Sequence, residues 1–224
     1  MSPRKTLVAG IEPNRKDDIL IAAERLFAER GNHGVSIRDI ADAAGVQLAL
    51  VGYYYGPKQA LYQEIFRQRS AYVEERLRRL GEAAEGSKRD RLERIVNAFV
   101  MPALAAAADP LRAPFLRLLA RGINDPLPED EAPIRELFDP LAHAFIEALA
   151  AGVPGCSRAQ AAWCYQFGLG ALMHHIVDRR VERLSLGECT AGDFKTTGPM
   201  LVRFIASGMR GACQLLAQPR PGAG

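Results

Sequence analysis

Apolar residues recur every three or four positions through most of this chain of 224 residues, and Gly- and Pro-containing segments separate the runs. This spacing predicts amphipathic α-helices. The sequence therefore predicts an all-α fold of about nine helices. Their expected ranges are 14–30, 36–44, 47–54, 57–80, 90–108, 111–123, 133–151, 157–183 and 193–216.

The second and third of these helices carry clear signals at their ends. Ser36 is a good N-cap, and Asp39 stands at the N3 position of a capping box. Gly45 follows the helix where a left-handed conformation is needed. Val46, Val51 and Tyr55 are spaced to face the neighbouring helices. Two short helices joined by a Gly-containing turn, after a packing helix, form a helix-turn-helix unit.

The outer side of the third helix would then face a DNA major groove. Gln47 is a poor N-cap, and its amide can instead make paired hydrogen bonds to adenine. Leu48, Ala49 and Leu50 offer only van der Waals contact, which suits thymine methyl groups. Packing against neighbouring helices is an equally good explanation for Leu48 and Leu50. Gly52 weakens the helix but lets its backbone approach DNA closely.

The stretch "VSIRDIADAAGVQLALVGYYYGPKQALY" resembles the DNA-binding signature of TetR-type transcriptional regulators, and the similarity is clear over residues 15–65. The resemblance implies a helical homodimer that binds double-stranded DNA. Each subunit would have a three-helix reader and a larger helical domain that binds a small effector. In this family the last two long helices commonly form a four-helix dimer bundle.

The resemblance also assigns roles to individual side chains. Ser36, Arg38, Tyr53 and Lys58 match positions that usually contact phosphates, and Tyr54, where His is frequent, is expected to bond to phosphate too. Such contacts fix the register of a protein on DNA without reading its sequence. Simple capping remains an alternative for Ser36, and simple solvation remains one for Arg38 and Lys58.

The domain organisation follows from these elements. Residues 1–13 are expected to be a disordered arm and residues 217–224 a disordered tail. Residues 14–56 would form the helix-turn-helix domain. Residues 57–216 would form the effector-binding and dimerisation domain, which begins with a connecting helix at 57–80.

An effector pocket is expected among the middle helices, where large apolar side chains gather. Its candidate walls, each of which could equally be ordinary core, are Phe99, Met101, Phe115, Leu119, Phe138, Phe145 and Trp163. The last two long helices have wide apolar faces, which indicate a dimer interface or, alternatively, intramolecular core. The candidate interface residues are Gly168, Ala171, Leu172, His175, Met200 and Phe204.

Composition changes this picture little. The net charge is +3, and the first 80 residues carry all of it, with 13 basic against 10 acidic residues. The four cysteines lack CxxC spacing and are expected to be reduced, mostly buried thiols. No secretory leader or membrane span is recognisable, so a cytoplasmic protein is expected. His174, His175 and Asp178 make a poor metal set, and hydrogen bonding is the preferred interpretation.

The leading hypothesis is therefore a dimeric DNA-binding transcriptional regulator. It would be a repressor that a small, mostly apolar effector releases from a palindromic operator. The alternative is a helical small-molecule-binding or scaffold protein whose reader lacks sequence preference. No catalytic motif supports an enzyme, and no cofactor or metal is expected.

Overall fold

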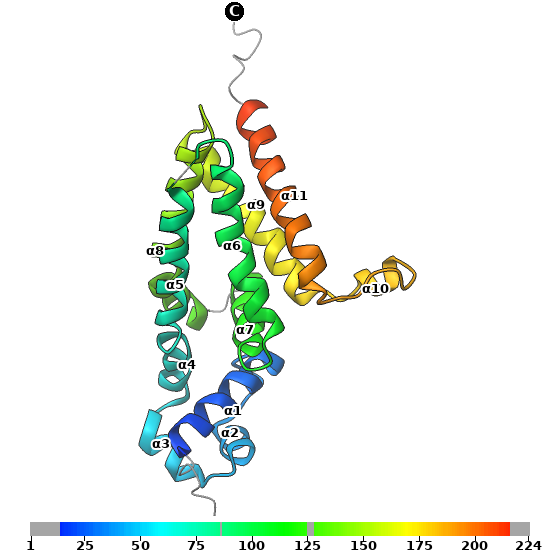
Figure 1. Cartoon of the computed structure of the whole chain (residues 1–224). Helices are drawn as coiled ribbons and strands as arrows, with labels where there is room; N and C mark the ends of the chain where they lie inside the picture. Colours follow the sequence, from blue (N-terminus) through cyan, green and yellow to red (C-terminus); the bar gives the residue numbers. More distant parts are fainter. Residues whose placement is uncertain (1–13, 86, 125–127, 216–224) are drawn as a thin grey trace, which may run out of the picture. The chain divides into compact units, whose positions relative to one another are not determined.

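A computed structural model describes residues 14–85, 87–124 and 128–215 (Figure 1). Within these ranges the chain is helical and contains no strand, which confirms the predicted all-α class. The expected arm at 1–13 and tail at 217–224 lie outside the described residues. The helices are α1 (Arg15–Arg30), α2 (Ile37–Ala44), α3 (Leu48–Tyr55), α4 (Lys58–Arg67), α5 (Ser70–Ala84), α6 (Arg91–Ala108), α7 (Ala113–Asn124), α8 (Pro128–Gly152), α9 (Arg158–Val177), α10 (Val181–Leu184) and α11 (Phe194–Leu215).

The helices fall into two compact units, and the division lies between Ile65 and Phe66. The N-terminal unit (residues 14–65) therefore keeps most of α4, whereas the sequence placed the boundary at residue 56. The reason is packing within this unit. The Tyr62 ring meets the Phe27 ring edge-on at 5.2 Å, and Leu61 and Ile65 are fully buried.

The core of the N-terminal unit forms where α1, α2, α3 and α4 meet. Ile19 and Phe27 of α1, Ile40 of α2 and Val51 of α3 are all fully buried. Tyr55 links α3 to α1 beside this core. Its hydroxyl donates a hydrogen bond of 2.8 Å to the Lys16 carbonyl in α1. Burial, helped by Glu64 and Asp17, raises the pKa of Tyr55 to about 12. The third helix is thus fixed to the first by its C-terminal end.

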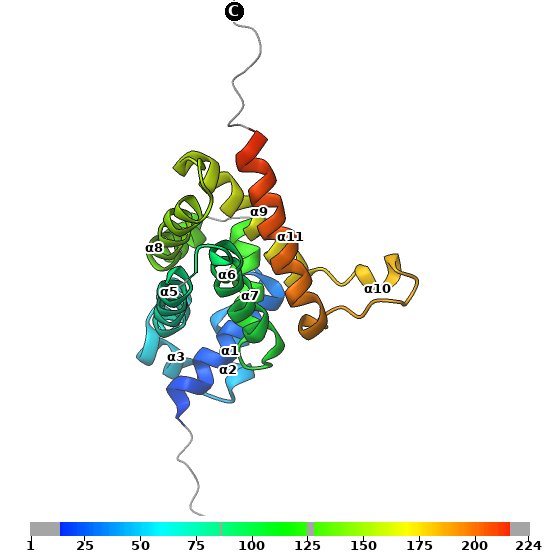
Figure 2. The ribbon, with the colours of Figure 1, turned by 45° about the horizontal axis from the view of Figure 1, so that its top comes forward.

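The C-terminal unit (residues 66–215) is built around α6, which contacts α5, α7, α8, α9 and α11. Leu92, Ile95, Val96, Val100 and Leu104 of α6 are almost completely buried. Figures 1 and 2 both show α9 and α11 side by side, and α10 standing away from the other helices of this unit. The α10 segment leaves Leu184 and Leu186 largely exposed.

Two of the predicted long helices are interrupted. The helix expected at 57–80 is broken between Arg67 and Ser70, where the Arg69 guanidinium lies over the Phe115 ring at 5.1 Å. The helix expected at 157–183 ends at Val177. There the Asp178 carboxylate accepts a hydrogen bond of 2.7 Å from the Arg180 backbone N–H, which is a local alternative to helical bonding. No described helix is both long and apolar enough to cross a membrane.

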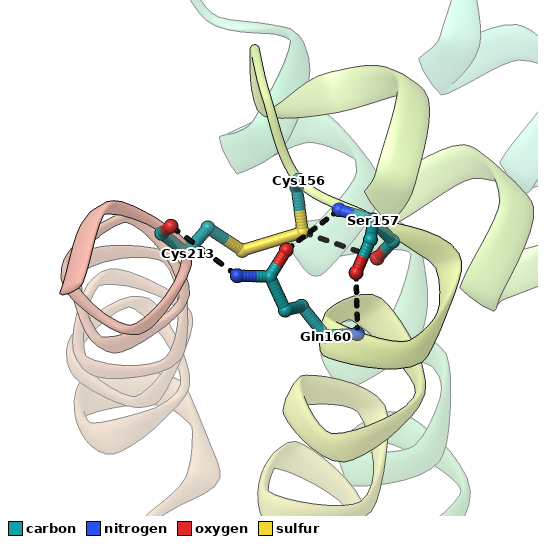
Figure 3. The surroundings of a disulfide bond; sticks show 4 residues. All are labelled: Cys156, Ser157, Gln160 and Cys213. Carbon is teal, nitrogen blue, oxygen red and sulfur yellow. Dashed lines mark hydrogen bonds between the residues drawn. A yellow bond between two sulfur atoms is a disulfide. The ribbon is translucent and has the colours of Figure 1, made fainter. Parts of the chain in front are cut away.

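The cysteines correct the expectation of reduced thiols. Cys156, in the loop before α9, forms a disulfide with Cys213 near the end of α11 (Figure 3). Gln160 strengthens the same junction, since its side-chain amide donates to the Cys213 carbonyl and completes a capping box with Ser157. Cys164 is free and buried, and Cys189 is free and exposed. Sequence spacing missed the pair because its cysteines are 57 positions apart.

Candidate functional site

The start of α2 is fixed by a complete capping box. The Ser36 hydroxyl accepts a hydrogen bond of 3.1 Å from the Asp39 N–H, and the Ser36 N–H donates to the Asp39 carboxylate at 2.7 Å. The hydroxyl also donates its own hydrogen to Asp39, at 2.6 Å. These bonds lower the pKa of Asp39. Ser36 is therefore an N-cap, and its hydroxyl could donate to a phosphate only after leaving Asp39.

Lys58 also has a structural role that its sequence position did not reveal. Its Nζ atom donates to the Asn32 carbonyl at 2.8 Å and to the Val35 carbonyl at 3.1 Å. These carbonyls belong to the turn between α1 and α2, so Lys58 ties α4 to the start of the helix-turn-helix. An ammonium group has three donors. One donor remains for the phosphate contact that the family resemblance implies.

The Lys58→Ala substitution tests both roles. We expect weaker binding to every DNA sequence, because the side chain carries no base readout. We also expect a free energy of unfolding lower by about 1–3 kcal/mol, because two carbonyls lose their partner. A lost phosphate contact would reduce the slope of log K against log salt by roughly 0.9 per site. Fluorescence anisotropy at several salt concentrations and urea unfolding measure these effects. A change confined to base preference would contradict the assignment.

Helix α3 presents most of its predicted reading side chains to solvent. Gln47, Leu48, Ala49, Tyr53 and Tyr54 are exposed. Gln47 makes no capping bond to α3, as its poor capping ability predicted, so its amide is available to a base. Arg38 of α2 is exposed as well, whereas Leu50 is half-buried. The packing alternative therefore holds in part for Leu50 and not for Leu48.

The exposed side of α3 borders a hollow. One residue that lines this hollow was not among the candidate DNA-binding residues. The hollow is open, has a volume of about 400 Å³, and includes Gln47, Ala49 and Tyr53 from this surface. Arg15, the first residue of α1, lines it too. Cationic side chains beside a reading helix supply sequence-independent affinity for phosphates. Only folding brings Arg15 to this place, since it lies 32 positions before Gln47 in the chain.

Gly52 offers a second test of the α3 surface. A Cβ atom built at this position meets nothing within 4 Å. Gly52→Ala is therefore expected to raise the free energy of unfolding by roughly 0.5–1 kcal/mol, because glycine weakens helices. We expect operator affinity to fall at the same time, because the methyl group would keep the DNA away from the backbone. Gly81→Ala on α5 is the matched control, since its Cβ is equally free. Equal affinities for the two variants would refute a close approach at Gly52.

Four of the predicted effector-pocket walls form two pairs of contacting rings in the structure. The Phe99 and Phe145 rings meet at 5.3 Å, and the Phe115 and Phe138 rings stack at 6.3 Å. Leu119 is buried, whereas Met101 is half-buried and its thioether lies against Gly198 of α11. Trp163 differs from the prediction, because it is 65% exposed and stacks on Phe167 at 6.0 Å. Trp163 therefore lies on the exposed side of α9 and is not a wall of an interior pocket.

The predicted dimer-interface residues divide into two groups. Met200 and Phe204 of α11 are exposed, and Ala171 is half-buried. Gly168 and Leu172 are instead buried within the subunit, where a Cβ on Gly168 would touch Ile205 of α11 at 3.3 Å. His175 bonds to Thr197 of α11 at 2.9 Å. Leu172 is therefore a core residue, which corrects the interface prediction at that position, whereas Gly168 and His175 contact α11 within the subunit.

Four large side chains together form what we call the α9/α11 apolar surface: Trp163, Phe167, Met200 and Phe204. Each of them is more than 60% exposed. Phe167 and Phe204 of this surface line a groove of about 160 Å³. Small residues also line it, among them Gly168, Ala171 and Gly208. Exposed aromatic side chains beside a groove of small residues are typical of a protein interaction surface.

The histidines next to this surface are engaged in hydrogen bonds. His174 lies 2.8 Å from the Asp178 carboxylate, and Asp178 also pairs with Arg180. Burial, with a smaller contribution from His174, lowers the pKa of His175. Within the described ranges no three His, Cys, Asp or Glu side chains are grouped to hold a metal ion. Hydrogen bonding was the preferred sequence interpretation, and the structure agrees with it.

Comparison with known proteins matches two segments of the chain to families. Residues 19–65 match the bacterial regulatory proteins of the tetR family, and residues 97–208 match the tetracyclin repressor-like C-terminal domain. An uncharacterized HTH-type transcriptional regulator of Mycobacterium tuberculosis is 30% identical over 195 residues, which cover 84% of this chain and 86% of that protein. The HTH-type transcriptional repressor KstR2 of Rhodococcus jostii is 40% identical over 53 residues, covering 24% of this chain and 26% of that one.

Solved structures show the same fold. The transcriptional regulator FadR from Bacillus subtilis, in complex with stearoyl-CoA, superimposes with a TM-score of 0.57. The match covers 86% of this chain and 98% of that one, at 16% sequence identity. At this identity the likeness concerns the fold alone.

Proposed function

This chain belongs to the TetR family of bacterial transcriptional regulators, and on that premise we propose that it is a ligand-responsive repressor. Proteins of this family are DNA-binding regulators and not enzymes. We propose that two copies bind a palindromic operator in the cytoplasm. A small, mostly apolar effector would bind in the C-terminal unit and release the DNA.

One observation carries the proposal for DNA reading. Helix α2 is capped at its start by Ser36 and Asp39, and at its end by Gly45 in the left-handed conformation. Helix α3 follows with its outer side chains exposed, and the Gln47 side-chain amide makes no capping hydrogen bond. A short helix held firmly at its base and free on its outer side is what a major groove accepts.

The α9/α11 apolar surface supports the proposal of a homodimer. A symmetric pair brings the same surface of two copies together, so an aromatic side chain of one copy can enter the groove of the other. Phe167 and Phe204 border that groove, and Gly168, Ala171 and Gly208 leave room in it. Burying such exposed apolar side chains is the main driving force for stable association.

The proposed effector site rests on the rings inside the C-terminal unit. Phe99, Phe115 and Phe145 are buried, so a ligand among them would meet mostly apolar walls. The stearoyl-CoA complex belongs to the Bacillus subtilis protein. Here it shows only that this fold accommodates a ligand with a long apolar part.

A gel-shift experiment with the DNA upstream of the protein's own gene tests the function. We expect a complex that resists excess competitor DNA and that maps to an inverted repeat. A metabolite panel, screened first by thermal shift, would identify compounds that stabilise the protein. One of them should dissolve the complex. Equal affinity for random duplexes would instead support the scaffold or small-molecule-binding alternative.

Gln47→Ala tests the direct readout. Because a glutamine amide can bond to adenine at two atoms, we expect preference at one base pair per half-site to relax, at a cost of about 1–3 kcal/mol. Affinities for a set of single-base operator variants measure this effect. Gln63→Ala, at an exposed position on α4, is the matched control. An unchanged pattern across the operator variants would show that Gln47 does not read a base.

A further inference from the structure

Arg76 is a buried charged residue in the C-terminal unit. It lies on α5 and only 4% of it is exposed. Its Nη2 atom donates to the Phe99 carbonyl at 2.7 Å, and its Nε atom is buried without a hydrogen-bond partner. The guanidinium carbon lies 5.5–5.6 Å from the ring centres of Tyr72, Phe99 and Phe145.

The neighbours of this positive charge are aromatic rings. Among the described residues, no carboxylate forms an ion pair with Arg76. Aromatic faces stabilise a cation, but more weakly than an anion does in a low-dielectric interior. A buried charge without a counter-ion destabilises the fold, and proteins normally pair it. An anionic ligand bound near Arg76 would therefore compensate its charge.

A cavity adjoins this charge on the same helix. It has a volume of about 280 Å³ and lies among α5, α6 and α7. Tyr72 links the cavity to the charge, because it lines the cavity and its ring faces Arg76. The Tyr72 hydroxyl is buried and has no hydrogen-bond partner. Unsatisfied buried polar groups are rare in folded proteins, and a bound ligand is one explanation for them.

The rest of the cavity lining is suited to a molecule with a charged end and an apolar end. Arg69 and Arg112 are cationic, whereas Phe115 and Leu116 are apolar and buried. The one acidic residue of the lining is Glu75. Its carboxylate is already held at 2.7 Å by Arg78 and by Arg79, so its charge is compensated.

We propose that this cavity binds a small organic acid, whose carboxylate meets Tyr72 beside the buried Arg76 and whose apolar part packs on Phe115 and Leu116. Arg69 and Arg112 also line the cavity wall, where Arg112 pairs with Asp109 at 3.4 Å. A volume near the lower end of the roughly 300–1,000 Å³ usual for ligand pockets favours a small acid. Taking this acid as the effector rests on the proposed function, and it adds one anionic group to the mostly apolar effector proposed there.

Binding of octanoate and of 1-octanol to the full-length protein tests the proposal, because the two probes differ mainly in charge. Thermal shift and isothermal titration calorimetry measure the affinities. We expect octanoate to bind at least tenfold more tightly than 1-octanol. Tyr72→Phe and Arg76→Met should each reduce octanoate affinity about tenfold or more, the size expected for a hydrogen bond to a charged group. Both variants should leave 1-octanol unaffected.

A loss of octanoate binding by Tyr72→Phe would not be explained by a loss of stability. Tyr72→Phe removes a hydroxyl that has no partner, so the variant should be at least as stable as the wild type. Arg117→Met is the matched control, because Arg117 is an exposed arginine on α7 outside the cavity lining. It should bind octanoate like the wild type.

The possible outcomes separate this inference from the proposed function. Equal binding of octanoate and 1-octanol, or octanoate binding that both substitutions leave unchanged, would overturn the anion site. No octanoate binding by a protein that still binds its upstream DNA would also overturn the site and leave the repressor proposal standing. Octanoate binding with the expected losses, in a protein without operator affinity, would support the site and refute the repressor.

Discussion

Phe204→Glu is expected to convert the protein from a dimer to a monomer and to weaken operator binding by about 100-fold or more. Phe204 is 69% exposed and borders the groove of the α9/α11 apolar surface. In a symmetric dimer each substitution acts twice, because both copies present the same residue. A carboxylate buried there without a partner opposes association.

The loss of DNA affinity follows from geometry. A dimer binds two half-sites together, and the second contact benefits from a high effective concentration. A monomer has to bind each half-site alone. Size-exclusion chromatography with light scattering and gel shifts on the same operator measure the two effects.

Leu111→Glu is the matched control for this substitution. Leu111 is also a large, exposed apolar residue, but it lies in the turn between α6 and α7 and outside the groove lining. We expect this variant to remain a dimer and to bind DNA normally. A dimeric Phe204→Glu variant with full operator affinity would show that the two copies meet elsewhere.

Opening the Cys156–Cys213 disulfide is expected to lower the free energy of unfolding of the C-terminal unit by about 4 kcal/mol. The cross-link closes a loop with a sequence separation of 57, which contains α9, α10 and most of α11. In the chain-entropy account, such a loop restricts the unfolded chain strongly and the folded chain very little. Guanidinium unfolding of wild type and Cys156→Ser, with and without dithiothreitol, measures the difference.

The exposed free thiol provides the control. Cys189→Ser should unfold like the wild type, because Cys189 is exposed and takes no part in the disulfide. Dithiothreitol should bring the wild type to the midpoint of Cys156→Ser. Thiol titration of the denatured, unreduced protein should find two free groups, and finding four would contradict the cross-link. In a reducing environment the disulfide would be reduced, and the protein would have the lower stability of the form without the cross-link.

The local features of the N-terminal unit could be predicted because they depend on neighbouring residues. The capping box of Ser36 and Asp39, the left-handed Gly45 and the uncapped start of α3 at Gln47 were all expected, and the structure contains them. Each is decided within a few positions of backbone. The packing of Tyr55 was also expected, because its position follows from helical periodicity.

Roles that depend on distant residues were missed or misjudged. The phosphate contact of Lys58 stays a prediction, but the sequence missed its bonds to the carbonyls of Asn32 and Val35, more than 20 positions earlier. Trp163 was expected inside the protein because an aromatic residue on an apolar helix is usually core. It is exposed and stacks on Phe167, because helix packing leaves this side of α9 uncovered within the subunit.

The sequence by itself determined the helical class, the helix-turn-helix and the family, because periodicity, caps and turn residues act over one or two helical turns. Only the tertiary structure decided which side of α9 is core, that Cys156 meets Cys213, and that Arg76 is buried with no ion-pair partner in the described part of the chain. These properties depend on which helices come together. Periodicity reveals that a helix has an apolar face, but packing alone decides what that face contacts.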